Sequence, residues 1–123
     1  MTVIDAGAVI KLLAGDVDLT TLGAGLSAPH LIDSEVLHTL RRLVHSGQFS
    51  PAHGEVAFDT FRRLIVRRWP ATPFLGRVWE LRHNLSGYDA TYVALAEALD
   101  VSLITTDGRL SKAPGLRCLV EVV

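Results

Sequence analysis

Acidic residues end or interrupt four of the apolar segments in this chain. Asp5 ends MTVID, Glu35 lies on the apolar face of IDSEVLHTLRRLV, Asp89 opens YDATYVALAEAL, and Asp107 ends VSLITTD. Because apolar segments fold into the core, the four carboxylates are expected to be partly buried, where they lose hydration and repel one another. A bound divalent metal is the usual way to hold such a set together, so these residues constrain both the fold and its chemistry.

The segments between these acids alternate between strand-like and helix-like patterns. Short apolar runs indicate strands at 2–5, 26–29, 66–70, 101–106 and 116–123. Helical spacing and capping residues indicate helices at 6–15, 31–45, 51–65, 73–84 and 87–99, with a weak helical turn at 19–25. This alternation predicts an α/β fold with a mainly parallel sheet. No repeat or linker divides the chain, so residues 1–123 are expected to form one domain.

The predicted fold brings the acids towards one edge of the sheet. Asp5 and Asp107 follow strands, and sites in open α/β sheets form at the carboxyl ends of strands. Asp89 lies near a helix N-terminus, where the helix dipole favours negative charge. Carboxylates without His or Cys beside them are hard oxygen ligands, which suit Mg²⁺ or Mn²⁺ better than Zn²⁺.

Each acid also has a purely structural interpretation. Asp5 is a good N-cap for the helix that follows it, Asp89 fits a capping box that begins at Ser86, and Asp107 starts an Asp-Gly turn. Glu35 is the hardest to explain in this way, because a Glu beside a core-facing stripe needs a cation. If all four acids lie at one edge of the sheet, four independent structural roles become a poor explanation of their shared position.

Composition narrows the function classes. The chain is 49% hydrophobic, which indicates either a largely buried sheet or apolar surface reserved for a partner such as a second copy of the chain. We expect no membrane helix, because no apolar run is long enough, and no signal peptide, because the N-terminus carries Asp5 and no basic lead. The single Cys118 excludes an internal disulfide and fits a reducing cytoplasm. The net charge of -1 does not indicate a nucleic-acid binder, although arginine pairs at 41–42, 62–63 and 67–68 offer either phosphate contacts or solvated helix faces.

The order of VIDAGAVI, HLIDSEVLHTLRRL, SGYDATYVALAEAL and LITTDGRL resembles the PIN-domain ribonucleases, and most of all the VapC-type toxins of bacterial toxin–antitoxin pairs. The resemblance covers essentially the whole chain. It implies a three-layer α/β/α domain with strand order 3-2-1-4-5, and RNA hydrolysis by water activated by Mg²⁺ or Mn²⁺. It further implies that Asp5, Glu35, Asp89 and Asp107 hold the metal, with Thr105 as a supporting hydroxyl. The implied partners are an RNA substrate and a cognate antitoxin, and we expect a homodimer.

One position departs from the family pattern. The family often has Ser or Thr two residues after the first Asp, and this chain has Gly7, so a hydroxyl that holds a metal-bound water is missing. Asp33 is left out of the site because a spacing of two residues places it on a different helix face from Glu35. The five histidines show no metal-ligand spacing and are interpreted as surface residues.

Three other functions compete with this prediction. A catalytically degenerate PIN domain would act as an RNA- or protein-binding module; the four acids argue against it and Gly7 argues faintly for it. A phosphatase of the haloacid-dehalogenase type needs a second Asp at the position of Gly7. A receiver-type phosphorylation domain needs an adjacent acid pair at the end of the first strand, which this chain lacks.

Overall fold

A computed structural model describes residues 1–15 and 25–123. The strands are β1 (Thr2–Ile4), β2 (Leu26–Pro29), β3 (Val66–Trp69), β4 (Leu103–Thr105) and β5 (Val120–Val122). The helices are α1 (Ala6–Leu13), α2 (Leu31–His45), α3 (Pro51–Arg63), α4 (Leu75–Glu80) and α5 (Gly87–Leu99), with 3-10 turns η2 (Thr72–Phe74) and η3 (Leu110–Lys112). The weak helical turn predicted at 19–25 lies outside the described residues, apart from Gly25.

The five strands form one parallel sheet in the order β3-β2-β1-β4-β5, as predicted. β1 is central and pairs with β4 on one side and β2 on the other. The pairing of β1 with β4 continues past the strand end, because the Asp5 N–H donates to the Ile104 carbonyl at 3.0 Å. The sheet therefore places the residues that follow β1 and β4 next to each other.

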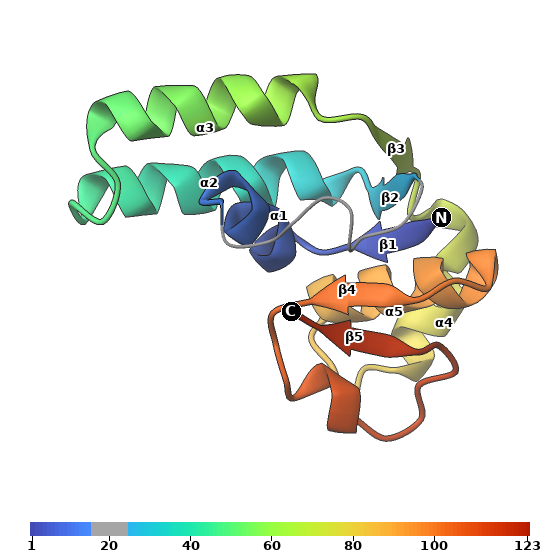
Figure 1. Ribbon diagram of the computed structural model, residues 1–123. Coiled ribbons are helices and arrows are strands. Elements are labelled where there is room, and N and C mark those ends of the chain that lie inside the picture. Colours follow the sequence, from blue (N-terminus) through green and yellow to red (C-terminus); the bar gives the residue numbers. More distant parts are fainter. Residues whose placement is uncertain (16–24) are drawn as a thin grey trace.

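Helices flank the sheet, and α2 and α3 form an antiparallel hairpin that extends beyond it (Figure 1). α4 and α5 lie behind the sheet in the same view. Every residue from Ala90 to Ala96 in α5 is buried, because this helix packs on β1 and β2 on one side and on α4 on the other. A helix covered on several sides is expected to be apolar around its circumference, as the sequence YVALA is.

The core gathers on the central strands and the helix faces that cover them. Its largest fully buried aliphatic side chains are those of Ile4, Ile32, Leu81, Leu95, Leu103 and Ile104. Core side chains thus fill the space directly beneath the carboxyl edge of β1 and β4. None of the described helices is both long enough and apolar enough to cross a membrane.

Several predicted elements are shorter in the structure. The helix predicted at 73–84 is a 3-10 turn followed by α4, which ends at Glu80 because the chain tightens around the buried Leu81. α3 ends at Arg63 rather than residue 65, since Leu64 takes an extended conformation. The strands predicted at 101–106 and 116–123 are reduced to three residues each.

Candidate active site

Asp5 joins the end of β1 to the start of α1. It is the N-cap of α1, and its Oδ1 accepts a hydrogen bond from the Ala8 N–H at 2.9 Å. Its Oδ2 accepts a hydrogen bond from the hydroxyl of Thr105, a fully buried residue of β4. The Thr105 hydroxyl also accepts from the Asp107 N–H at 3.0 Å. One hydroxyl thus connects the first and last acids of the predicted site.

Glu35 lies in the second turn of α2 and faces α5. Its Oε1 accepts a hydrogen bond from the Tyr92 hydroxyl at 2.7 Å. Tyr92 follows Asp89 by three residues, which places both on one face of α5. Burial raises the pKa of Tyr92 well above its ordinary value, and the hydrogen bond to Glu35 raises it further. The phenol therefore stays protonated and donates to the carboxylate.

Asp89 is the third residue of α5. Its N–H donates to the side chain of the N-cap residue Ser86 at 3.1 Å, so the structural role predicted for this segment is present. Its half-buried carboxylate lies in the field of Asp107. Helix capping and membership of an acidic cluster are therefore compatible at this position.

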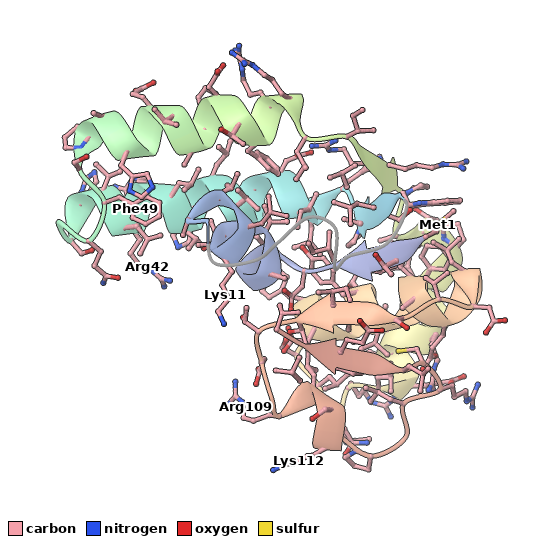
Figure 2. All side chains as sticks on the ribbon, in the orientation of Figure 1. Met1, Lys11, Arg42, Phe49, Arg109 and Lys112 are labelled. Carbon is pink, nitrogen blue, oxygen red and sulfur yellow. The ribbon has the colours of Figure 1, made fainter. Side chains whose placement is uncertain are left out.

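Asp107 forms an ion pair with a cation, which the other three acids do not do with any described residue. Its two oxygens accept hydrogen bonds from Nε and Nη2 of Arg109 at 3.1 and 3.0 Å, and Oδ1 also accepts from the Arg109 N–H at 3.0 Å. The Arg109 side chain is 91% exposed and projects from the loop that follows β4 (Figure 2). An exposed pair of this kind is held weakly and can be exchanged for another partner.

The four carboxylates influence one another electrostatically. Burial raises the pKa of Asp5, hydrogen bonds from Thr105 and Ala8 lower it, and the charges of Asp89 and Asp107 raise it again. Burial likewise raises the pKa of Glu35, which Tyr92 partly offsets and the charges of Asp89 and Asp5 increase.

The remaining two acids differ in direction. Burial and then the charge of Asp107 raise the pKa of Asp89, against the lowering effects of Ser86 and Arg109. The Arg109 guanidinium, by contrast, holds the pKa of Asp107 below its usual range. Four residues from four separate parts of the chain thus influence one another as a single charge cluster.

The donor set fits a hydrated divalent cation better than a closed cage. Within residues 1–15 and 25–123, no group of three or more His, Cys, Asp or Glu side chains is gathered closely enough to hold a metal. The oxygens of Asp5, Glu35 and Asp107 are turned instead towards Thr105, Tyr92 and Arg109. Carboxylates with hydroxyl neighbours suit Mg²⁺ or Mn²⁺, and Mg²⁺ usually keeps several waters and takes one or two carboxylates. A metal here would be held partly through water or after side-chain rotation.

A pocket of about 300 Å³ opens beside the acids. It is lined by Asn84, Leu85, Ser86, Asp89, Asp107, Arg109, Leu110 and Ala113. Apolar side chains contribute to its wall, while an amide, a hydroxyl and a guanidinium supply polar groups. This combination is typical of sites for small molecules or single units of a polymer.

The other sequence interpretations can be compared with the structure directly. Asp33 forms a bidentate ion pair with Arg68 of β3, so its carboxylate is used in a contact with that strand. The five histidines are all exposed. Cys118 is half-buried.

Two residues that contact the acids were not singled out from the sequence. Tyr92 had a usable signal, because it is a polar ring three residues after Asp89 within an otherwise apolar helix. Arg109 had a weaker one, its position two residues after Asp107.

Comparison with known proteins gives consistent results. The family model described as "PIN domain" matches residues 2–116. Ribonuclease VapC9 of Mycobacterium tuberculosis is 46% identical over 125 residues, which cover 100% of this chain and 98% of that protein. Ribonuclease VapC1 of the same species is 46% identical over 128 residues, which cover 98% of this chain and 96% of that protein.

Two solved structures have a similar fold. PAE2754 from Pyrobaculum aerophilum has a TM-score of 0.74 at 23% identity, with 98% of this chain and 83% of that chain covered. A chain from the structure of VapBC2 from Rickettsia felis bound to a promoter DNA fragment has a TM-score of 0.67 at 15% identity, with 99% of this chain and 98% of that chain covered. At these identities the structural likeness concerns the fold.

Proposed function

Because the chain belongs to the PIN-domain family, and its full-length relatives are VapC ribonucleases, we propose that it is a metal-dependent endoribonuclease and the toxin of a type II toxin–antitoxin pair. One observation carries the proposal. Asp5, Glu35, Asp89 and Asp107 come from four different elements, yet they meet as one charge cluster at the carboxyl ends of β1 and β4. We assign the four as the metal-binding and catalytic residues.

Mg²⁺ or Mn²⁺ is the cation we propose for this site. Within the described residues, no Lys, Arg or His forms an ion pair with Asp5, Glu35 or Asp89, so a cation is the missing partner. When bound, such a cation lowers the pKa of its water and stabilises negative charge on a phosphodiester. Protons compete with a metal for the carboxylates, and the raised pKa values of Asp5, Glu35 and Asp89 place this competition at a higher pH than for free carboxylates, so metal affinity falls as pH falls.

The surrounding side chains orient the acids. The Thr105 hydroxyl and the first turn of α1 fix both oxygens of Asp5. Tyr92 fixes Glu35 in the same way. Groups that orient metal-binding carboxylates typically change metal affinity or activity 10- to 100-fold when they are removed. We therefore assign Thr105 and Tyr92 as positioning residues.

Arg109 is the cation placed to meet RNA. It lies at the pocket beside Asp89 and Asp107, and its planar guanidinium suits a phosphate group as well as it suits a carboxylate. The RNA backbone would pass over the acidic cluster, with one nucleotide against the pocket. The substrate class is RNA, as in the names of the relatives.

We also propose a cytoplasmic protein that forms a homodimer and binds a cognate antitoxin. Two solved chains with this fold come from structures titled VapBC, one from Rickettsia felis and one from Salmonella typhimurium. The α2–α3 hairpin carries an open apolar groove of about 330 Å³, to which Leu37, Leu40, Val44 and Phe58 contribute. Co-expression with the gene for a neighbouring small DNA-binding protein should give a complex that no longer cleaves RNA.

A catalytically degenerate binding module is the second candidate. It is favoured by Gly7, which lacks the hydroxyl common in the family, and by the ion pair that occupies Asp107. Such a module would bind RNA in EDTA and leave it intact when metal is added.

RNA cleavage by purified protein separates these functions. Incubation with a mixture of transfer, ribosomal and messenger RNA should give discrete fragments with Mg²⁺ or Mn²⁺ and none with EDTA. Asp89→Asn should reduce cleavage to background, whereas Asp59→Asn should not, since Asp59 pairs with Arg62 and Arg63 on the surface of α3. Cleavage by Asp89→Asn at the wild-type rate would refute the site assignment, and binding without cleavage by the wild type would favour the module.

A further inference from the structure

Gly7 and Thr106 compete for one space beside the acidic cluster. Gly7 lies in the first turn of α1, two residues after Asp5, and Thr106 lies between β4 and Asp107. A Cβ atom on Gly7 would lie 2.5 Å from the Thr106 Oγ1 and 3.7 Å from the Asp5 Oδ1. The first distance is far shorter than real Cβ contacts, so a side chain at position 7 would force the Thr106 hydroxyl out of the position that it holds here.

The hydroxyls of the two consecutive threonines are used differently. Thr105 is buried, and its hydroxyl donates to Asp5 and accepts from the Asp107 N–H. Thr106 is half-exposed, and its hydroxyl forms no hydrogen bond with residues 1–15 or 25–123. A hydroxyl offers one donor and two acceptor positions. Among the described residues, the Thr106 hydroxyl is therefore an uncommitted polar group, and it lies close to Asp5 in a half-exposed side chain.

Resting on the proposed function, we propose that Thr106 is a positioning residue of the metal site. Its hydroxyl occupies the space that a side chain at position 7 would enter, where the family resemblance leads us to expect a hydroxyl, and it would hold a water molecule beside Asp5 when a divalent cation is bound. The hydroxyl comes from the end of β4 instead of the first turn of α1, but it reaches the same space. Gly7 is then the consequence of Thr106 and not a lost function.

The steric conflict between positions 7 and 106 can be tested from either side. A serine at position 7 forces the Thr106 hydroxyl out of its position, whereas a serine at position 7 combined with alanine at position 106 restores one hydroxyl to the shared space. Residues that share one space are expected to be strongly non-additive. A role for Thr106 in packing alone predicts no such restoration.

The test measures two properties of each variant. Manganese affinity without RNA is measured from the electron paramagnetic resonance signal of free Mn²⁺, and kcat and KM are measured on a fluorogenic RNA. Thr106→Val should weaken Mn²⁺ binding and lower kcat by roughly 10-fold or more, the range found when groups that orient metal ligands are lost. Thr106→Ser keeps the hydroxyl and should stay close to wild type. Thr106→Ala should match Thr106→Val, and Gly7→Ser with Thr106→Ala should recover most of the loss.

Thr60→Val is the matched control, since the Thr60 hydroxyl is bonded to the Val56 carbonyl on α3, and it should leave both properties unchanged. Thermal melts in EDTA establish that each variant is folded. Wild-type Mn²⁺ affinity and kcat in Thr106→Val would overturn the inference and leave the proposed function standing. Equal losses in Thr106→Ser and Thr106→Val, or no recovery in the double variant, would also overturn it. A wild-type protein that neither binds Mn²⁺ nor cleaves RNA would refute the proposed function first.

Discussion

The carboxylates on the two sides of the acidic cluster are stabilised by different kinds of partner. On the inner side, Asp5 and Glu35 are partly buried and accept hydrogen bonds from the neutral hydroxyls of Thr105 and Tyr92. Their pKa values are raised because burial disfavours the charged form. The acids on this side therefore gain protons at a higher pH than free carboxylates do.

On the outer side, Asp107 is paired with the exposed Arg109, and its pKa is lowered. This side tends to retain a cation. A divalent metal that binds all the acids must therefore compete with protonation of the inner acids at a higher pH than for free carboxylates, and with an arginine on the outer side. The pKa values of acids in one site can therefore be shifted in opposite directions, and mutation of each acid or its partner can test this difference.

The largest effect is expected for Asp5→Asn. Metal-dependent RNA cleavage should fall to background, because the central carboxylate is lost. The fold should be retained, since Asn is as good an N-cap as Asp and a buried charge is removed. Circular dichroism and cleavage of the same sample provide the check, and an unfolded variant or an active one would contradict the expectation.

Tyr92→Phe should have the next largest effect. It removes the hydrogen bond to Glu35 and keeps the ring that packs in α5, so activity should fall by about 10- to 100-fold. Because the Tyr92 hydroxyl lowers the pKa of Glu35, that pKa should rise in the variant and the pH–rate profile should move to higher pH. Tyr88→Phe is the matched control, as Tyr88 is exposed at the start of the same helix. An unchanged pH–rate profile would show that the Tyr92 hydroxyl does not lower the pKa of Glu35.

Arg109→Ala should have a smaller effect with two opposite signs. Without RNA, Mn²⁺ should bind about threefold more tightly, because an exposed competing cation is gone. With RNA, KM should increase, because a phosphate contact is lost. Arg62→Ala removes another exposed, ion-paired arginine and should change neither property. If Mn²⁺ and RNA both bound more tightly, or both bound more weakly, the proposed exchange of Arg109 between Asp107 and phosphate would be wrong.

The smallest effect concerns the pH dependence of stability in EDTA. The folded-state pKa of Asp5 lies above its ordinary value of 3.8, so its cost to stability is absent below that value and grows as pH rises through the folded pKa. Asp5→Asn should therefore raise the melting temperature relative to wild type by a few degrees at pH 7, and by less at pH 4. Asp107 has a lowered pKa, so its contribution is present at neutral pH and lost in acid.

Asp107→Asn should consequently lower the melting temperature at pH 7. Thermal melts across this pH range decide between the two signs. The same sign in both variants would remove the distinction between the inner and outer sides.

The sequence predicted the fold well because its signals are local. The capping residues Asp5 and Ser86 are where they were predicted, whereas the strand order was expected from the family resemblance and not from a local signal. Helix ends were less predictable. The end of α4 depends on the burial of Leu81, and the end of α3 depends on the extended backbone of Leu64, neither of which has a local signal.

For the site, the sequence identified the acids but not their partners. Tyr92 meets Glu35 across 57 positions of sequence, through the packing of α5 against the rest of the fold. The relation between Gly7 and Thr106 depends on the approach of α1 to the end of β4, which no spacing in the sequence reveals. From the sequence alone, Gly7 is therefore interpreted as the loss of a hydroxyl. In the structure, the Thr106 hydroxyl lies where a side chain at position 7 would begin.

The most direct test of the central claim is a crystal structure of the protein with Mn²⁺, with the metal located by its anomalous scattering. The account predicts one or two peaks at the carboxyl ends of β1 and β4, within direct or water-mediated reach of Asp5, Glu35, Asp89 and Asp107, with Arg109 released from Asp107. Strong anomalous peaks elsewhere, together with an empty acidic cluster and an intact Arg109–Asp107 pair at saturating Mn²⁺, would contradict it.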